Sequence, residues 1–311
     1  MSGRERVDVN VGEEAENGIR VDRYLSEQMD LFSRSQIRLR NVSVSVNGRD
    51  AKLSRRVHPG DVLEVSFEEP EESRLQPENI DLEILFENEQ VVVINKRAGV
   101  VVHPGAGNWN GTVVQGLLYR FQEMGKAFEG DRVRPGIVHR LDKDTSGVLI
   151  AAKDPRAQEF LAGQFRKKRA EKTYLAIVKG CPRHGQGVIQ GLLRRDPHNR
   201  KRFELTDTDG RRSETAYRMV KCFGTHALVV LHPSTGRTHQ IRVHMQSAGC
   251  PILGDPLYGR KDQLFPDAGL MLHAYKLRIV LPGEEVPTTF SAPIPRRVTE
   301  TLALLHHLQK R

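Results

Sequence analysis

The sequence predicts an α+β protein of two domains: a small N-terminal one, and a larger one built on a mixed, largely antiparallel sheet. A chain of 311 residues is longer than one small module, and its length favours two domains. A charged, proline-punctuated stretch over residues 69–79 predicts a linker between them. Beyond the linker, strand-like runs outnumber helical patterns without a strict βαβ alternation, which is typical of an α+β domain.

The N-terminal part divides into a tail and a compact unit over residues 19–68. Residues 1–18 are polar and acidic, so we expect them to be disordered. Apolar spacing and turn signals predict the elements of the unit. They are a helix over 21–29, a second helix from Ser33 to about residue 40, a strand over 42–46 that enters an Asn47-Gly48 hairpin, and a strand over 62–67.

The larger domain, residues 80–311, is expected to contain more strands than helices. Apolar runs and alternation predict the strands, and apolar residues three and four apart predict the helices. The strands are expected over 82–86, 91–94, 100–102, 137–138, 148–152, 174–178, 188–192, 216–220, 227–231 and 276–280, and the helices over 112–122, 157–166 and 238–248.

The charge balance predicts a polyanionic partner. The chain has 48 Lys and Arg against 39 Asp and Glu, a net charge of +9, which favours binding to phosphates. No run approaches the ~18 apolar residues of a membrane span, and the N-terminus lacks an apolar signal region. The three cysteines form no C-x-x-C pair, which predicts neither a zinc ribbon nor a disulfide framework. We therefore expect a soluble, cytoplasmic protein, and a monomer by default.

The stretch G-I-V-H-R-L-D-K-D-T-S-G-V-L-I over residues 136–150 carries the strongest candidate for chemistry. It places one acid, Asp142, between two cations, in a turn between two apolar runs that we expect to be buried. Asp144 and Ser146 have a simpler explanation, because Asp and Ser commonly bond backbone amides within turns.

A second candidate stretch is T-G-R-T-H-Q-I-R-V-H-M over residues 235–245. Thr238 is expected to cap a helix whose Ile241 faces the core. Arg242 then lies about 100° round the helix, at a margin where it could pair with a buried acid. His239 and His244 are five residues apart and share no helix face, so the spacing predicts no metal site. No nucleotide-binding glycine motif is present either, and we expect no cofactor.

Two further sets of residues have both a functional and a simpler explanation. Tyr174, in E-K-T-Y-L-A, is either a packing aromatic with a wet hydroxyl or part of a site. The second N-terminal helix would place Arg34 and Arg38 on one face to meet phosphates, unless that face is only solvated. The basic clusters over 166–169 and 194–202 are open to the same two interpretations.

The motifs resemble two known families. The N-terminal unit resembles an S4 domain, a small RNA-binding module, on Arg23, Leu25, S-R-S over 33–35, V-N-G over 46–48 and Gly60-Asp61. The larger domain resembles the RluA-type pseudouridine synthases, and most nearly the S4-containing RluD-type enzymes. The motifs that carry this second resemblance occur in order as N-K at 95–96, V-H-P-G-A-G at 102–107, H-R-L-D at 139–142, E-K-x-Y at 171–174, G-R-T-H-Q-I-R-V-H at 236–244, L-G-D at 253–255, Y-G at 258–259 and H-A at 273–274.

The resemblance implies a pseudouridine synthase fold and the isomerisation of uridines in large-subunit ribosomal RNA, free or in a ribosomal particle. It makes Asp142 the catalytic carboxylate, Tyr174 the residue that stacks on the base and accepts the C5 proton, and Arg242 the partner of Asp142. Arg140 would hold the flipped nucleotide, beside His139 and Leu141 of the same motif. The alternatives are the same chemistry on transfer RNA, a non-catalytic assembly factor and, more remotely, a metal hydrolase.

The sequence departs from the family patterns at three places. Arg97 stands where a proline usually follows Asn-Lys, and residues 260–270 form a shorter segment than in many relatives. The stretch 35–47 is about two residues shorter than in most S4 domains, which could shorten its RNA-facing helix. None of these departures touches the proposed catalytic residues.

Overall fold

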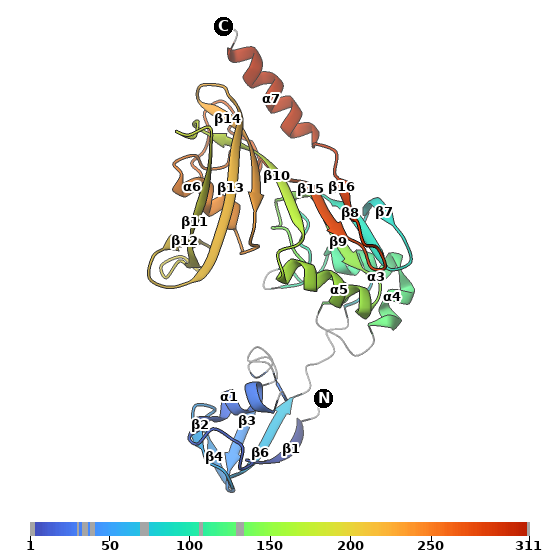
Figure 1. The fold of residues 1–311 in the computed structure, drawn as a ribbon, viewed down its shortest axis with the longest axis vertical. Helices are drawn as coiled ribbons and strands as arrows, with labels where there is room; N and C mark the ends of the chain where they lie inside the picture. Colours follow the sequence, from blue (N-terminus) through green and yellow to red (C-terminus); the bar gives the residue numbers. More distant parts are fainter. Residues whose placement is uncertain are drawn as a thin grey trace. The chain divides into compact units, whose positions relative to one another are not determined.

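Two units make up the chain, Met1–Arg74 and Leu75–Arg311, shown in the computed structural model of Figure 1. The structure describes residues 4–29, 31–32, 37, 41–68, 75–105, 108–128 and 134–309.

The first unit is built on a four-stranded antiparallel sheet with the order β1-β6-β3-β4. The predicted hairpin is confirmed, because Asn47 and Gly48 both adopt positive φ and join β3 to β4. The helix expected over 21–29 is a short α-helix that continues as a π-helical segment. Its elements are β1 (Arg4–Asn10), β2 (Ile19–Arg20), α1 (Val21–Arg23), η1 (Tyr24–Gln28), β3 (Ser43–Val46), β4 (Arg49–Ala51), β5 (Arg56–Val57) and β6 (Val62–Glu68).

The prediction of a disordered tail over residues 1–18 is wrong for its first part. Residues 4–10 form β1, which pairs with β6 along its whole length. Val7 and Val9 alternate with charged residues and pack against the core of the unit, and this period of two is the signal of a half-buried strand. Of the second predicted helix the structure describes only Ile37. Arg34 and Arg38 lie outside the described residues, so the RNA-binding role of this unit stays a prediction.

The second unit is built on a ten-stranded sheet whose main path is β12-β11-β13-β14-β10-β15-β9-β8-β7, with β16 paired to β15. The pairings are antiparallel except β9 with β15, which confirms the prediction of a mixed, largely antiparallel sheet. Its strands are β7 (Glu83–Glu87), β8 (Val91–Lys96), β9 (Ser146–Ala152), β10 (Glu171–Lys179), β11 (Gln186–Arg195), β12 (Phe203–Thr206), β13 (Arg211–Cys222), β14 (His226–Pro233), β15 (Leu272–Val280) and β16 (Pro287–Ser291).

The parallel pair β9–β15 depends on a glycine. Gly147 has φ of +120°, and a Cβ atom there would lie 2.1 Å from the carbonyl oxygen of Ala274. Any other residue would force the two strands apart. All seven residues of β9 are buried, so this strand firmly anchors the turn before it, which carries Asp142.

Two helices of the second unit, α5 and α6, lie against the sheet (Figure 1), where α5 contacts β9 and α6 contacts β11 to β13. Asp154 begins α5 by accepting the N–H of Ala157 at 2.9 Å, and proline occupies the first turn, as is usual at a helix start. No helix in the described ranges is long and apolar enough to cross a membrane. The helices are α3 (Val113–Arg120), α4 (Gln122–Ala127), α5 (Pro155–Arg166), α6 (Gln240–Ser247) and α7 (Arg296–Gln309).

Several sequence predictions for this unit need correction. Residues 100–102 form no strand, only an isolated bridge from Val101 to Thr112, and Ile137 likewise makes only a bridge. The cap of α6 is His239, in the left-handed conformation at φ of +56°, and not Thr238. The elements that the pattern did not predict are α4, β12, β16 and α7.

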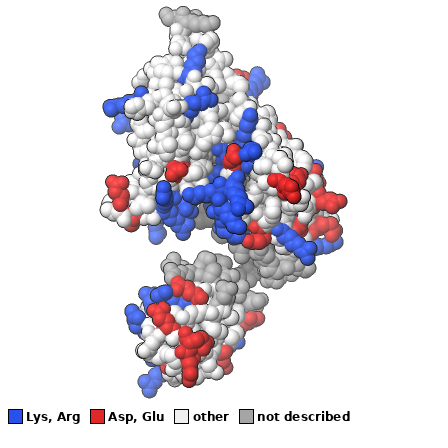
Figure 2. Space-filling model, viewed as in Figure 1, with Lys and Arg blue, Asp and Glu red and all other residues white. Residues whose placement is uncertain are grey.

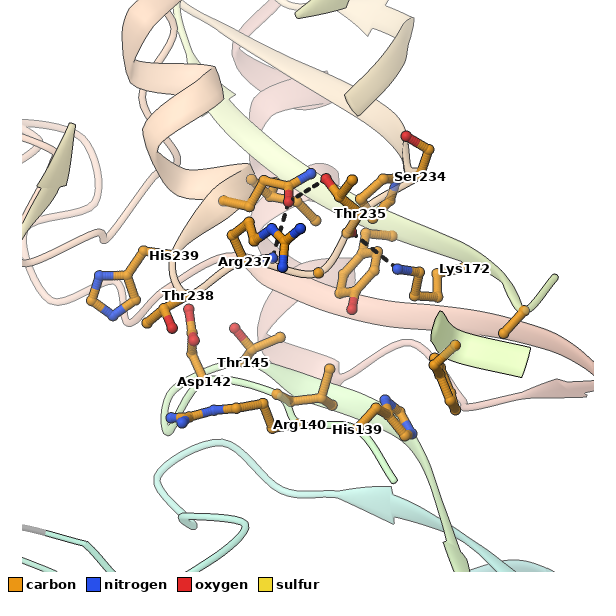
Figure 3. Close-up of a pocket in the computed structure, with 18 of the residues that line it drawn as sticks. His139, Arg140, Asp142, Thr145, Lys172, Ser234, Thr235, Arg237, Thr238 and His239 are labelled. Atoms are coloured by element: carbon orange, nitrogen blue, oxygen red, sulfur yellow. Dashed lines mark hydrogen bonds between the residues drawn. The ribbon is translucent and has the colours of Figure 1, made fainter. Parts of the chain in front are cut away.

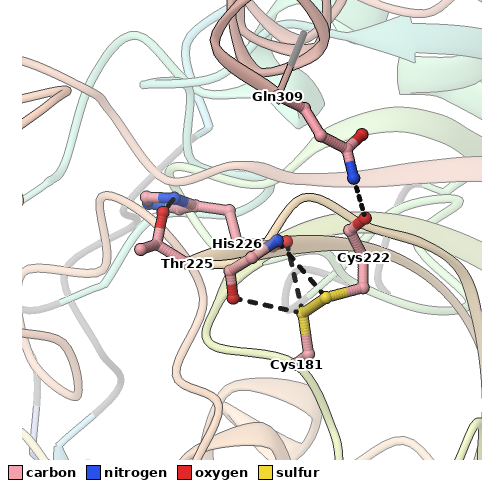
Figure 4. Close-up of a disulfide and its surroundings, with 6 residues drawn as sticks. Cys181, Cys222, Thr225, His226 and Gln309 are labelled. Carbon is pink, nitrogen blue, oxygen red and sulfur yellow. Dashed lines mark hydrogen bonds between the residues drawn. A yellow bond between two sulfur atoms is a disulfide. The ribbon is translucent and has the colours of Figure 1, made fainter. Parts of the chain in front are cut away.

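The prediction of no disulfide is also wrong, because Cys181 and Cys222 are bonded, with their Cα atoms 5.8 Å apart (Figure 4). They are 41 residues apart in the sequence, so no local spacing could reveal them. The sheet brings them together: β10 and β13 both pair with β14, opposite Ala227 near its start. The remaining cysteine, Cys250, is buried and free.

Candidate active site

A cavity of about 510 Å³, called here the first cavity, opens in the second unit beside Asp142. The chain around residues 138–145 forms one side, and the segment 233–242 before and within α6 forms the other (Figure 3). β10 supplies Lys172 and Tyr174 to the same cavity. Three stretches far apart in the sequence therefore converge on one space, and all three carry motifs that the sequence singled out.

Asp142 lies at the start of a tight turn that leads into β9. The N–H of Thr145 donates to the carbonyl of Asp142 at 3.1 Å and closes the turn. The side chain of Lys96, which is 2% exposed, donates three hydrogen bonds to the carbonyls of residues 97, 100 and 143 at 2.7–2.9 Å. Burial lowers the pKa of Lys96 to about 7, against the opposite effect of Asp142 and Asp144. Through these three hydrogen bonds, Lys96 fixes the backbone of the turn and of the neighbouring segment 97–100.

Arg242 bridges two carboxylates, of which Asp255 is the closer. Its Nε and Nη2 donate to the two oxygens of Asp255, both at 2.8 Å, whereas its Nη1 reaches Asp142 at 3.5 Å. The side chain of Asp255 is wholly buried and that of Asp142 is 18% exposed. The arginine is therefore held by the protein on one edge, and its other edge is turned to the acid that faces the cavity.

Tyr258 completes this arrangement from the far side. The guanidinium carbon of Arg242 lies 5.1 Å from the centre of the Tyr258 ring, within the range of a cation–π contact. The Tyr258 hydroxyl accepts the N–H of Phe203 at 2.8 Å and bonds Nδ1 of His239 at 2.9 Å. His239 lines the cavity beside Asp142 (Figure 3), and burial lowers its pKa.

Tyr174 lies on β10 between β14 and β15, opposite Leu231 and Ala274. A register shift falls between Thr173 and Tyr174, a local irregularity that re-aims side chains at a site. Burial, and secondly the charge of Asp142, raise the pKa of the phenol. Tyr174 therefore presents a neutral aromatic ring to the cavity.

The three other residues of the H-R-L-D motif take different positions. His139 accepts the N–H of Ile150 through Nε2 at 3.0 Å and stacks on Phe165 with ring centres 4.5 Å apart. Burial, with a smaller effect of Lys172, lowers the pKa of His139 to about 3, so its ring is neutral and anchors the motif to β9. Leu141 is 4% exposed and packs in the core. Arg140 is exposed at the mouth of the cavity.

The first cavity is strongly cationic. Burial lowers the pKa of Lys172 to about 8, and its Nζ donates to the carbonyl of Thr235 at 3.0 Å. In Figure 2, Lys and Arg gather near α5 and the adjoining end of the β11–β13 strands. The cations that line the cavity, against the single acid Asp142, are Arg140, Arg166, Lys168, Lys172, Arg237 and Arg242. Such a lining favours a phosphate-bearing ligand.

Sequence reasoning assigned no role to three residues of this site: Lys96, Lys172 and Asp255. Each stands within a motif, but nothing in the local pattern tells a buried lysine from an exposed one. Asp255 lies 13 residues from Arg242 and meets it only in three dimensions. Among the described residues, no group of three or more His, Cys, Asp and Glu side chains is placed to hold a metal ion.

Comparison with known proteins agrees with this geometry. The family model described as RNA pseudouridylate synthase matches residues 90–247. The chain is 45% identical over 289 residues to ribosomal large subunit pseudouridine synthase D of Borreliella burgdorferi, covering 91% of this chain and 88% of that protein. The protein of the same name from Neisseria meningitidis serogroup A, strain Z2491, is 35% identical over 301 residues, covering 93% of this chain and 79% of that one.

A solved structure, human RNA pseudouridylate synthase domain containing 4, matches with a TM-score of 0.57 and 27% identity. The match covers 72% of this chain and 93% of that one. Family model, relatives and fold all agree, and the residues of the H-R-L-D, E-K-x-Y and G-R-T-H-Q-I-R motifs converge on one cavity. The chain belongs to the RNA pseudouridine synthases of the RluA type, which are isomerases.

Proposed function

We propose that this enzyme isomerises uridines of large-subunit ribosomal RNA, and that Asp142 is its catalytic carboxylate. The observation that carries the proposal is the position of Asp142, which faces a cationic cavity beside Tyr174 and Arg242. The ribosomal substrate is supported by the relatives at 45% and 35% identity, both named for the large subunit.

The target uridine has to leave its stack, because its glycosidic bond is inaccessible within a helix. Arg140, exposed at the mouth of the cavity, takes the vacated position or holds the backbone of the flipped nucleotide. The cations around the cavity bind the phosphates on either side. The base enters the first cavity and lies against the ring of Tyr174.

Asp142 then acts at the ribose of the flipped nucleotide. The N1–C1′ bond breaks, the uracil turns within the cavity, and C5 bonds to C1′. The proton on C5 is lost and N1 ends protonated, so the reaction is redox-neutral with no net gain or loss of atoms. Arg242, fixed by Asp255, holds the carboxylate of Asp142 in place during these steps.

For Tyr174, we propose base stacking as the main role. A raised pKa means that the phenol remains protonated, which counts against a proton acceptor at C5. Tyr174→Phe should therefore keep most activity, while Tyr174→Ala, which removes the ring, should lose it. A Phe variant as inactive as the Ala variant would restore the proton-transfer role.

The test of function is carbodiimide mapping of pseudouridines in large-subunit ribosomal RNA from cells that lack the protein. Stops that vanish without the protein should return with wild type but not with Asp142→Asn. Asp267→Asn, at an exposed aspartate outside the cavity, is the matched control and should restore them. If all ribosomal stops persist in the deletion and transfer-RNA stops vanish instead, the substrate is transfer RNA. If no stop changes in either RNA, the proposal fails.

A further inference from the structure

A second cavity of about 540 Å³ lies on the other side of Asp142. It shares Asp142, Arg242 and His239 with the first cavity, so these side chains belong to a common wall. Its remaining sides come largely from residues 101–105, Asn108 and Lys143. Its volume is within the range of pockets that hold small organic ligands, and none of the roles proposed above uses it.

Asn108 presents an oriented amide to this second cavity. Its backbone is fixed, because its N–H and carbonyl exchange hydrogen bonds with Gly105 at 2.8 and 3.1 Å. Its side-chain oxygen accepts Nζ of Lys143 at 3.0 Å. That bond fixes which end of the amide is the oxygen, so the NH₂ group is the end left over. Among the described residues no acceptor bonds this NH₂ group, which makes it an available donor.

Trp109 follows directly after Asn108 and is 66% exposed. It is the only tryptophan of the chain, and tryptophan is usually among the highly buried residues. Trp109 is not itself a lining residue, but it is the next residue after Asn108, which lines the second cavity. Exposed aromatic rings close to positive charge are the features on which unpaired bases stack in single-strand-binding proteins. Arg134, Arg140 and Lys143 line the second cavity and supply the positive charge that an RNA backbone requires.

The position of the catalytic acid connects the two cavities to one RNA strand. If the target base fills the first cavity, its ribose lies at Asp142, on the wall that both cavities share. The RNA chain continues from that ribose in both directions. One neighbouring nucleotide therefore begins at the opening of the second cavity.

We infer that the base of one nucleotide adjacent to the target uridine binds at the second cavity, hydrogen-bonded by the NH₂ group of Asn108 and stacked on Trp109, the next residue of the chain. The inference rests on the proposed function, and it adds a sequence-context element to it: the enzyme reads a neighbour of the uridine that it modifies.

The experiment measures kcat/KM on RNA hairpins in which the nucleotide on either side of the target is replaced by an abasic one. With wild type, the abasic substitution should cost about tenfold on one side only, the scale of a lost stacking contact. Trp109→Ala should lose a similar factor on intact RNA and nothing further on the abasic RNA. Trp109→Phe should keep most activity, and Tyr119→Ala, at an exposed aromatic outside both cavities, should match wild type.

The amide has a test of its own. Asn108→Asp keeps an oxygen for Lys143 and exchanges the donor for an acceptor, so it should change which of the four bases is preferred at that position. The inference is overturned if abasic nucleotides are tolerated on both sides, if the Trp109 and abasic losses multiply, or if Asn108→Asp keeps the wild-type preference.

Tryptophan fluorescence separates this inference from the proposed function. Quenching of Trp109 by RNA should be weaker when the neighbouring base is absent, and this can be measured in Asp142→Asn, where no turnover is expected. Base-dependent quenching by an enzyme inactive on every RNA would support the binding site and refute the proposed activity. Equal quenching with and without the base would refute the binding site.

Discussion

Asp255→Asn is the substitution that most directly tests how the site is held together. The buried Asp255 accepts two hydrogen bonds from Arg242, both at 2.8 Å. Each hydrogen bond to a charged group contributes about 1.5–3 kcal/mol, and breaking a buried pair costs about 3–5 kcal/mol. An asparagine oxygen still accepts one of the two bonds, so we expect a loss near the lower limit, about 3 kcal/mol in the free energy of unfolding.

The loss should be visible both in stability and in catalysis. For a unit of this size, about 3 kcal/mol corresponds to a fall in Tm of roughly 6–12 °C. Arg242 would then turn toward Asp142 as its only carboxylate partner, so kcat should fall at least tenfold while KM for RNA changes little. Thermal unfolding followed by circular dichroism and steady-state kinetics measure the two effects.

The matched control is Glu300→Gln, which removes the 2.7 Å ion pair between Glu300 and Arg296 on the exposed face of α7. Exposed pairs contribute little, so this variant should match wild type in both measurements. If Asp255→Asn is no less stable than Glu300→Gln, the buried pair with Arg242 does not hold the site. If it unfolds earlier but keeps its kcat, Asp255 supports the fold and does not position Arg242.

Three further predictions follow from buried charged or titratable groups and from the disulfide. Burial lowers the pKa of His244 and of His273 to about 4, so the unfolded chain binds more protons below pH 6.5. The free energy of unfolding should fall by about 3 kcal/mol per histidine between pH 6.5 and 4, and His244→Gln should remove its share in acid titrations by circular dichroism. Lys96→Met leaves three carbonyls without their donor, so urea unfolding should show a loss of at least about 2 kcal/mol together with reduced turnover; wild-type stability would contradict the anchoring role. The bond between Cys181 and Cys222 closes a loop of 41 residues. Reducing this bond, or preventing it with Cys181→Ser, should lower the free energy of unfolding by about 4 kcal/mol relative to the oxidised protein. If Cys181 and Cys222 react as free thiols without denaturant, the bond is excluded.

The sequence predicted β9 and β10 well, because each contains a run of five apolar residues, over 148–152 and over 174–178. It failed for residues 100–102, a short apolar run whose neighbours do not align it into a sheet. It also failed for β1. Two valines among charged residues are a weak signal for a strand, and the strand is recognised only from its pairing with β6.

For the site, the motifs and the family resemblance that they carry predicted Asp142, Tyr174 and Arg242, and all three line one cavity. It did not predict that the closer partner of Arg242 is Asp255, because a carboxylate that is wholly buried looks no different in the sequence from an exposed one. The left-handed backbone of His239 was missed for a similar reason. In that conformation the ring of His239 bonds the hydroxyl of Tyr258 and packs edge-on against Phe203 and Tyr258, residues that are far from it in the sequence.

The burial of Asp255 also explains how a cavity with six cations could serve both of the roles proposed for it, catalysis and RNA binding. Asp255 balances Arg242 from inside the protein, away from the space that the RNA enters. One edge of the Arg242 guanidinium is therefore bonded to Asp255, and the other edge is directed to Asp142. Arg140 has no acidic partner among the described residues and is exposed. A charge count cannot distinguish these two kinds of cation: one arginine is paired with the proposed catalytic acid, and the cations without a buried partner remain available for phosphate.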